Sequence, residues 1–244
     1  MTSFDTVGSM IILSEKTNDA KKTAERLLKQ HKNIKTVAIK TENYSGKYRT
    51  PKLKILAGKR TKTTLYKENN VTLKLNPETC YFSARLATER KRIASLVKNG
   101  EKILVMFSGV APYPIILSKN TKAKSIIGIE INPKAHKFAL ENLKLNKTKN
   151  VKLYMGDVKR VIPKLKKFDR IVMPHPTDAE SYLDLAIKHL KKNGTIHFYD
   201  FQLEKDFEKT IDKIKKHCRP KSIKIKKCGQ AAPRRYRIVA DFKI

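Results

Sequence analysis

From about Arg85 onward, apolar strand patterns alternate with helix patterns five times, and this alternation constrains the fold more than any other feature. The five strands are predicted at Lys102–Phe107, Ser125–Ile131, Val151–Asp157, Arg170–Met173 and Gly194–Phe201. Two more apolar stretches, Ser222–Cys228 and Arg235–Ile244, are predicted to pair as a hairpin. Alternating strands and helices are typical of a parallel sheet covered by helices on both faces. The order therefore predicts an α/β fold, a doubly wound sheet with a C-terminal antiparallel hairpin.

The first part of the chain has a different pattern. From about Met10 to Leu75 the apolar segments are short, and one helix pattern interrupts them around Ala24 and Leu27. Several short strands with a single helix indicate a small α+β module. We therefore expect two domains, a small RNA-binding or linker domain at 1–75 and the doubly wound domain at 76–244.

The charge of the chain indicates its kind of partner. Lysine and arginine number 55 against 22 acidic residues, a formal net charge of +33. A growth-temperature bias normally raises glutamate together with lysine, and here the acids do not match. The excess favours a polyanion, most simply nucleic acid. No apolar run is long enough for a membrane span, and three cysteines without a CxxC pair favour a reducing, cytoplasmic location and give no support for a metal site.

Acidic residues end two neighbouring predicted strands. Glu130 closes the second strand and Asp157 the third. An acid at the end of the second strand suits the two hydroxyls of a ribose, although Asp157 is equally well placed to cap the next helix. The loop after the first strand, with Gly109, is a weak glycine fingerprint, and no phosphate-binding lysine motif accompanies it. The pattern favours an adenosine cofactor without a pyrophosphate.

The fourth strand ends at the unusual sequence "MPHP". Pro174 and Pro176 cannot donate to a strand ladder, so they end the strand and stiffen the loop that follows. Thr177 and Asp178 are predicted to cap a helix that runs to about Leu190. A rigid loop at this end of a parallel sheet is a place where α/β folds bind ligands.

Several segments together resemble a known family. The five-unit order resembles the class I, Rossmann-like S-adenosylmethionine-dependent methyltransferases. "CYFSARLATER" (Cys80 to Arg90), the segment Lys47 to Asn70, "MFSGVAPY", "EINP", "HFYDF" and "APRRYRIVADFKI" are similar to the archaeal and eukaryotic tRNA (guanine-37 N1)-methyltransferases. The resemblance covers nearly the whole chain and is closest to the archaeal, wyosine-associated subgroup. Relatives often carry a further N-terminal domain that reads the outer corner of tRNA, and we expect this chain to lack it.

The resemblance implies a cofactor, a substrate and a set of roles. The cofactor is S-adenosylmethionine, and the partner is tRNA, bound at position 37 of the anticodon loop by a monomeric enzyme. Glu89 is the expected general base for N1 of guanine, Arg49 the stabiliser of charge on O6, and Tyr81 the stacking partner of the extruded base. Arg85, Pro174, His175 and Pro176 are expected to contact substrate. Cofactor contacts are expected from Phe107, Gly109, Val110, Glu130, Ile131, Asn132, Asp157 and Met173.

The chain departs from the family at three positions, and these keep alternatives open. Val105 stands where relatives often have an acid, Ala111 where glycine is usual, and Pro174 where relatives have an asparagine. The loss of that amide keeps open a second activity, methylation at C7 of the wyosine precursor 4-demethylwyosine. An aminocarboxypropyl transferase of wyosine synthesis and a non-catalytic RNA-binding module are the other readings, although the intact Tyr81 and Glu89 favour methyl transfer.

Overall fold

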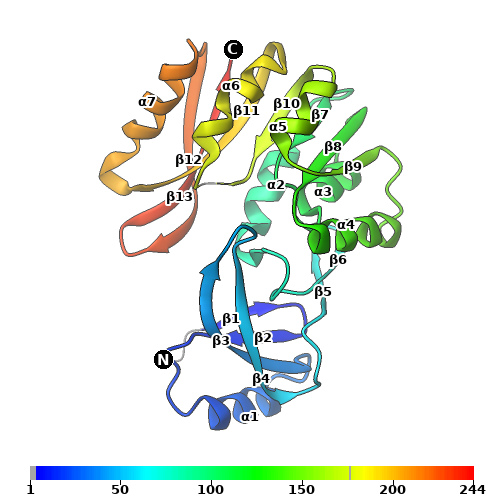
Figure 1. Cartoon of the computed structure of the whole chain (residues 1–244), viewed down its shortest axis with the longest axis vertical. Coiled ribbons are helices and arrows are strands. Elements are labelled where there is room, and N and C mark those ends of the chain that lie inside the picture. Colours follow the sequence, from blue (N-terminus) through cyan, green and yellow to red (C-terminus); the bar gives the residue numbers. More distant parts are fainter. Residues whose placement is uncertain (1–3, 176) are drawn as a thin grey trace.

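The structure, a computed structural model, describes residues 4–175 and 177–244. Figure 1 shows a small N-terminal body, in blue, next to a larger α/β body that contains the C-terminal half of the chain. In the described part of the chain, no helix is long and apolar enough to cross a membrane.

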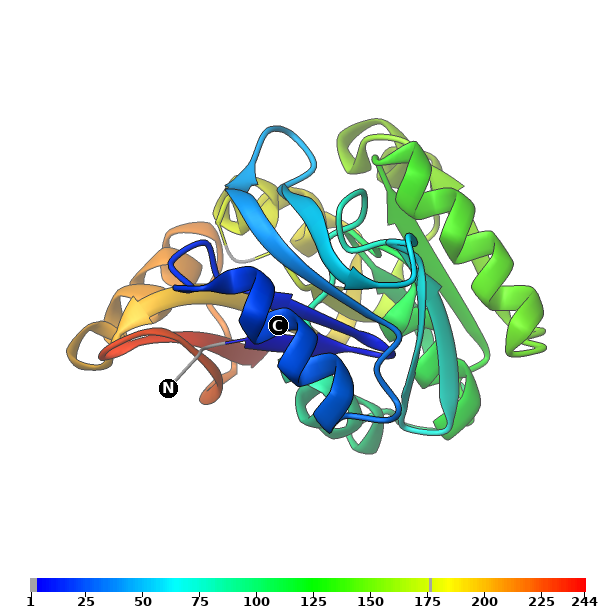
Figure 2. The same ribbon diagram turned by 90° about the horizontal axis from the view of Figure 1, so that it is seen from below.

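The N-terminal body is a four-stranded sheet with one helix. The strands lie in the order β1 (Phe4–Val7), β2 (Met10–Leu13), β3 (Thr36–Ser45) and β4 (Thr50–Gly58). Helix α1 (Ala20–Gln30) connects β2 to its parallel neighbour β3 and crosses the sheet, as seen from below in Figure 2. Ala24 and Leu27 are spaced three apart, so both face the sheet, where they pack on Ile11, Leu13 and Val37.

A second core joins the two bodies. Val7, Met10 and Leu53 of the four-stranded sheet belong to the same buried cluster as Ile103 and Ile115 of the α/β body. This shared apolar packing holds the N-terminal body against the larger one.

A separate two-stranded sheet lies between the bodies, formed by β5 (Thr64–Glu68) and β6 (Val71–Leu75). The amide side chains of Asn142 and Asn146 take the place of a neighbouring strand for β6. Each amide accepts from one backbone N–H of β6 and donates to a carbonyl of the same residue, at Lys74 and Thr72. Our division of the chain after residue 75 stays a prediction, and this small sheet lies just before it.

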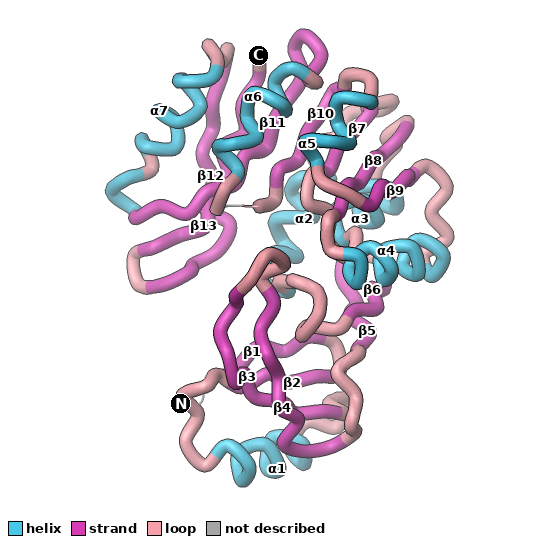
Figure 3. Tube along the Cα trace, in the orientation of Figure 1, coloured by secondary structure: helices cyan, strands magenta, loops and turns pink. Residues whose placement is uncertain are grey.

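The larger body confirms the expected doubly wound sheet (Figure 3). The sheet order is β12, β13, β11, β10, β7, β8, β9, and the five strands from β11 to β9 are parallel. Strand β13 is antiparallel and lies between β11 and β12, the expected hairpin. The strands are β7 (Lys102–Val105), β8 (Ser125–Glu130), β9 (Val151–Met155), β10 (Phe168–Met173), β11 (Leu190–Leu203), β12 (Ser222–Ala232) and β13 (Arg235–Lys243).

Helices cover the sheet on both faces. Residues of α2, α3 and α4 share one core cluster, and residues of α5, α6 and α7 share another. Side chains of β7 alternate between them, with Ile103 and Val105 in the first cluster and Leu104 in the second. The helices are α2 (Ala87–Ser95), α3 (Pro112–Asn120), α4 (Pro133–Leu145), α5 (Val158–Val161), α6 (Leu183–Lys188) and α7 (Glu208–His217). Four 3₁₀ turns accompany them, at Ala84–Leu86, Ile162–Lys164, Ala179–Tyr182 and Glu204–Asp206.

The helix expected after a cap at Thr177 and Asp178, running to about Leu190, is confirmed only in part. Asp178 makes no side-chain cap, and the segment begins as the 3₁₀ turn Ala179–Tyr182 before the short helix α6. Leu190 already belongs to β11, where it pairs with Phe168. The apolar periodicity alone assigned Leu190 to the helix, but pairing with Phe168 places it in the sheet.

Candidate active site

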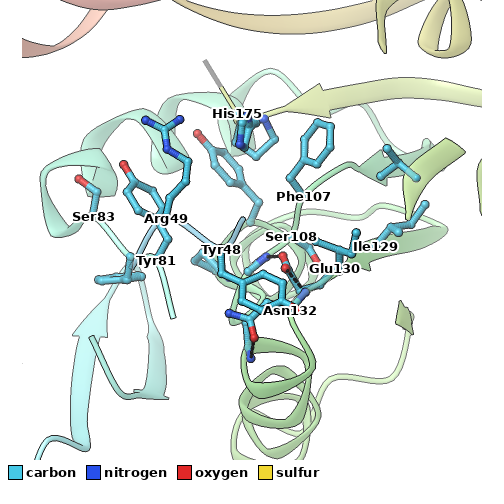
Figure 4. A pocket seen from close by; sticks show the side chains of 18 of the residues that line it. Tyr48, Arg49, Tyr81, Ser83, Phe107, Ser108, Ile129, Glu130, Asn132 and His175 are labelled. Atoms are coloured by element: carbon cyan, nitrogen blue, oxygen red, sulfur yellow. Dashed lines mark hydrogen bonds between the residues drawn. The ribbon is translucent and has the colours of Figure 1, made fainter. Parts of the chain in front are cut away.

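One cavity of about 340 Å³ lies at the carboxyl ends of β7, β8, β9 and β10, where doubly wound sheets bind ligands (Figure 4). Its lining comes from both bodies. Lys47, Tyr48 and Arg49, from the turn between β3 and β4, face the loops that follow the parallel strands. The segment from Tyr81 to Arg90 supplies another wall.

Glu130 organises one end of the cavity. Its Oε2 accepts from the N–H of Gly109 at 2.6 Å, and its Oε1 accepts from the N–H of Asn132 at 2.7 Å. The carboxyl therefore ties the loop after β7 to the loop after β8. Burial raises the pKa of Glu130, against the pull of these backbone hydrogen bonds. A carboxylate has about four lone-pair positions, so Glu130 keeps acceptor capacity for a ribose hydroxyl.

The neighbouring cofactor candidates also line the cavity. Phe107 and Ile131 supply apolar surface, and Asp157 lies beside them at the end of β9. Asp157 also caps α5 by accepting from the N–H of Lys159 at 2.8 Å, which confirms the expected cap, and its contact with the cofactor stays a prediction. Asn132 lines the cavity and caps α4. A cavity with the carboxyl of Glu130 at one end and apolar walls beside it fits an adenosine cofactor.

Two cofactor candidates, Val110 and Met173, are not brought to the cavity. The side chains of both are completely buried in the two cores. The carbonyl of Val110 accepts from the amide of Asn142, and the carbonyl of Met173 accepts from the N–H of His175. In the loop after β7, which contains Gly109, Ala111 has a φ of +66°. This value lies in the left-handed region, which favours the glycine that is usual at this position in relatives.

The "MPHP" loop forms the wall opposite Glu130. Pro174 and His175 line the cavity, and Pro176 lies outside the described residues. The His175 ring packs on Phe107 with ring centroids 5.2 Å apart. Burial, with the nearby Arg49 cation, lowers the pKa of His175, so the imidazole is neutral at pH 7. Its Nδ1 is buried and has no hydrogen-bond partner in the described part of the chain.

Arg49 and Tyr81 lie together on the side of the N-terminal body. Arg49 occupies the left-handed region at φ +51° in the β3–β4 turn, and its guanidinium donates to Oγ1 of Thr177. This contact joins the turn to the loop after β10 across the cavity. Tyr81 accepts a hydrogen bond of 2.7 Å from Arg237, and the residue as a whole is 36% exposed. A partly exposed aromatic ring at the mouth is suited to stack on a base.

Arg85 points away from the cavity. Its guanidinium makes two hydrogen bonds to Oδ1 of Asp5, at 2.5 and 3.1 Å, in the N-terminal sheet. Arg85 lines a second depression, of about 550 Å³, next to the first. The expected contact of Arg85 with substrate stays a prediction.

Glu89 is buried behind the cavity wall rather than in it. Its carboxylate is 5% exposed and accepts from Arg92 at 2.7 and 2.8 Å and from the Tyr199 hydroxyl at 2.7 Å. Leu86 and Arg90, on the same segment, do line the cavity. These three bonds occupy three lone-pair positions, and Oε2 keeps one for a further donor.

A chain of charged residues extends from Glu89 into the sheet. Arg92 donates to both oxygens of Asp241, at 2.6 and 3.2 Å, and Asp241 pairs with Nδ1 of His197 at 2.5 Å. Burial alone would raise the pKa of Asp241, but the hydrogen bonds from His197 and Arg92 outweigh it and bring that pKa to about 2. Nε2 of His197 faces Arg170, which only donates, so Nδ1 carries the proton.

Sequence reasoning missed many of the residues that line the cavity, among them Lys47, Tyr48, Tyr113 and Arg237. Tyr113 is 2.8 Å from Tyr199, hydroxyl to hydroxyl, and thereby connects the cavity wall to the partner of Glu89. The alternation of side chains along β13 offered a signal for Arg237. Residues two apart in a strand share a face, so Arg237 lies on the same face as the buried Val239 and as Asp241. No group of metal-binding side chains occurs among the described residues.

The parallel sheet, the acid after its second strand and the cavity beside it define a class I, Rossmann-like methyltransferase. Residues 64–226 match the model of the TRM5/TYW2 methyltransferase domain, and residues 1–61 match the TYW2 N-terminal domain. The chain therefore belongs to the TRM5/TYW2 family, and its methyl donor is S-adenosylmethionine.

Three curated relatives span the activities of this family. The chain is 36% identical over 252 residues to tRNA (guanine(37)-N(1))-methyltransferase Trm5b of Pyrococcus abyssi, covering 100% of this chain and 75% of the relative. It is 33% identical to tRNA (guanine(37)-N(1))/4-demethylwyosine(37)-methyltransferase Taw22 of Nanoarchaeum equitans, covering 87% and 88%. It is 30% identical to tRNA(Phe) (4-demethylwyosine(37)-C(7)) aminocarboxypropyltransferase of Methanocaldococcus jannaschii, covering 98% and 97%.

Two solved structures bear on the ligands. The complex of aTrm5 with tRNALeu superposes with a TM-score of 0.90 at 32% identity, covering 99% of this chain and 72% of that one. M. jannaschii TYW2 in complex with AdoMet superposes with a TM-score of 0.78 at 26% identity, covering 99% and 98%. Both agree with the fold derived above.

Proposed function

We propose that this protein methylates N1 of guanosine 37 in tRNA. One observation supports this best: the carboxyl of Glu130 and the side chains of Arg49 and Tyr81 line the same cavity, with Glu130 toward one end and the other two toward the other. The first end suits the adenosine part of the cofactor, and the second suits an extruded base. The cofactor, when bound, supplies an electrophilic methyl group on a sulfonium.

We propose the following roles for the residues of this chain. Tyr81 stacks on the base, and Arg49 stabilises the negative charge that develops on O6. Glu89 takes the N1 proton on the free position of Oε2, and the N1 electron pair then forms the new N–C bond as the S–C bond breaks. Since Glu89 lies behind the cavity wall, RNA binding must shift side chains of that wall, such as Leu86, to bring N1 within reach.

The loop after β10 is the proposed wall for the far edge of the base. It offers Pro174 and the neutral ring of His175 where relatives have a side-chain amide. A wall without that specific contact is tolerant of a larger ring system. For this reason C7 methylation of 4-demethylwyosine stays a second candidate activity, and one relative is named as a methyltransferase of both guanine 37 and 4-demethylwyosine 37.

The decisive experiment is nucleoside mass spectrometry. A tRNA transcript with guanosine at position 37 is incubated with enzyme and methyl-labelled cofactor, and a transcript with adenosine 37 is the control. We expect 1-methylguanosine carrying one labelled methyl group from the first transcript and no labelled nucleoside from the second. An aminocarboxypropyl adduct, or a methyl group elsewhere, would contradict the proposal.

Two further expectations remain proposals. Cytoplasmic location follows from action on tRNA, and a monomer is the state in which one chain supplies every residue of the proposed site. A non-catalytic RNA-binding module predicts no cofactor binding. Isothermal titration with S-adenosylmethionine tests that alternative, and micromolar binding would exclude it.

A further inference from the structure

A second depression of about 550 Å³ adjoins the proposed active site. It lies between the N-terminal sheet and the β12–β13 hairpin, and we call it the hairpin groove. The cavity and the hairpin groove share a wall, formed by Arg49, Tyr81, Phe82, Ser83, Leu86 and Arg237. Whatever enters the cavity past Tyr81 therefore also passes the hairpin groove.

The hairpin groove is cationic. Lys40, Arg49, Arg85 and Arg237 line it, against one carboxylate, Asp5. Asp5 is already engaged by Arg85 at 2.5 Å and by Lys40 at 3.7 Å. The groove thus has a surplus of positive charge that its own acid does not neutralise.

Arg237 is held in place by neutral groups. Its Nη2 donates to the Tyr81 hydroxyl at 2.7 Å, and its guanidinium carbon lies 5.0 Å from the centroid of the Phe201 ring. Among the described residues, Arg237 has no carboxylate within ion-pair distance, and its Nε is buried without a hydrogen-bond partner. The position of the Arg237 side chain is therefore fixed, while its charge is not paired with a carboxylate of the described residues and some of its N–H groups can still donate.

We propose that Arg237 binds one of the two phosphates that flank the target nucleotide. A planar guanidinium recognises phosphate through two parallel hydrogen bonds, and stacking on an aromatic ring leaves its edge free for this. Since Arg237 also donates to Tyr81, the same contact would set the ring that stacks on the base. This inference rests on the proposed function and makes Arg237 a substrate-binding residue.

The matched control is Arg235, two residues earlier on the same face of β13. Its guanidinium carbon also stacks on Phe201, at 5.6 Å, but Arg235 lines neither the cavity nor the hairpin groove. The two arginines therefore share charge, strand and stacking partner. They differ in access to the substrate.

The first test compares Arg237→Gln with Arg235→Gln. For Arg237→Gln we expect KM for tRNA to rise roughly 10-fold, the salt dependence of binding to flatten by about one phosphate contact, and cofactor affinity to stay unchanged. For Arg235→Gln we expect less than a 3-fold change in KM. Equal effects of the two substitutions would mean that Arg237 contributes only to the overall positive charge, and this result would overturn the proposal.

The second test neutralises the phosphate instead of the protein. Semi-synthetic tRNA carries a methylphosphonate at one or the other phosphate flanking nucleotide 37, and its affinity is measured with wild-type and Arg237→Gln enzyme. One of the two substitutions should weaken wild-type binding roughly 10-fold and should hardly weaken the Gln variant further. Additive losses at both phosphates would contradict the contact. These affinities are measured without turnover, so they are separate from the test of the methylated atom.

Discussion

Tyr199 donates a hydrogen bond of 2.7 Å to Oε1 of Glu89, and the two residues are 110 positions apart in the chain. The bond joins β11 to α2 and fixes one oxygen of the proposed base. Because the Tyr199 proton goes to Glu89, Tyr113 must donate to the Tyr199 oxygen. Tyr199 is therefore a positioning residue, acting through Glu89.

Tyr199→Phe removes this bond to a carboxylate. We expect a roughly 10- to 100-fold slower single-turnover methyl transfer. Tyr113→Phe, which leaves the Tyr199–Glu89 bond intact, should change the rate less than 3-fold. A wild-type single-turnover rate for Tyr199→Phe would contradict the positioning role.

Glu89→Gln keeps the shape of the side chain and removes its basicity. We expect methyl transfer to slow by roughly 100-fold or more, the usual range for a general base, with tRNA affinity unchanged within 3-fold. Glu141→Gln on the exposed face of α4 is the control and should have the wild-type rate. Single-turnover rates with saturating cofactor decide this, and a wild-type rate for Glu89→Gln would remove Glu89 from the catalytic role.

Glu130→Gln is expected to weaken cofactor binding about 10-fold or more, measured by calorimetric titration. Glu130 now accepts hydrogen bonds from two backbone N–H groups, and the amide of glutamine would place its own N–H against one of them. The amide is also a neutral and weaker acceptor for the ribose than the carboxylate. Asp157→Asn can still cap α5, so its loss should be smaller. Equal losses would mean that Glu130 has no special role at the ribose.

Stability should fall on acidification in two stages. Burial lowers the pKa of His197 below its ordinary 6.5, so the unfolded chain binds the proton first and stability drops as the pH falls below about 6.5. The pKa of Asp241, lowered to about 2, adds stability that is present above about 3.8 and is lost as the pH falls toward 2. Urea unfolding of wild type and His197→Gln between pH 7.5 and 5 measures the first stage. The variant should show the flatter dependence, and parallel curves would disprove the assignment.

The architecture was predictable because it depends on local patterns. Alternating apolar strands and helices predict the order of elements in the α/β body. The same apolar pattern places Glu130 at the end of its strand. The end of the helix after Asp178 was not predictable, because pairing of Leu190 with Phe168 decides it. Asp178 itself showed that a suitable residue type does not guarantee a cap.

The site was predictable only in part, for a related reason. Residues near one strand end, such as Asp157, come together through topology that the chain order reveals. Arg237 and Tyr113 reach the cavity from β13 and α3, and nothing in their local sequence indicates that they meet Tyr81 and Tyr199. The partners of Glu89 were equally hidden, since Arg92 is a neighbour on the helix but its anchor, Asp241, is 149 residues away.

The place of β13 has a consequence for synthesis on the ribosome. Strand β13 inserts between β11 and β12, so β11 has an open edge until the residues that follow β12 have emerged. Glu89 and Arg92 emerge long before Asp241, which completes their charged chain. In the proposed mechanism, a nascent chain that stops before β13 has the loops that line the cavity but lacks the residue that anchors Arg92 beside Glu89. We therefore expect methyl transfer to require this strand, so that a product truncated before β13 has no activity rather than reduced activity.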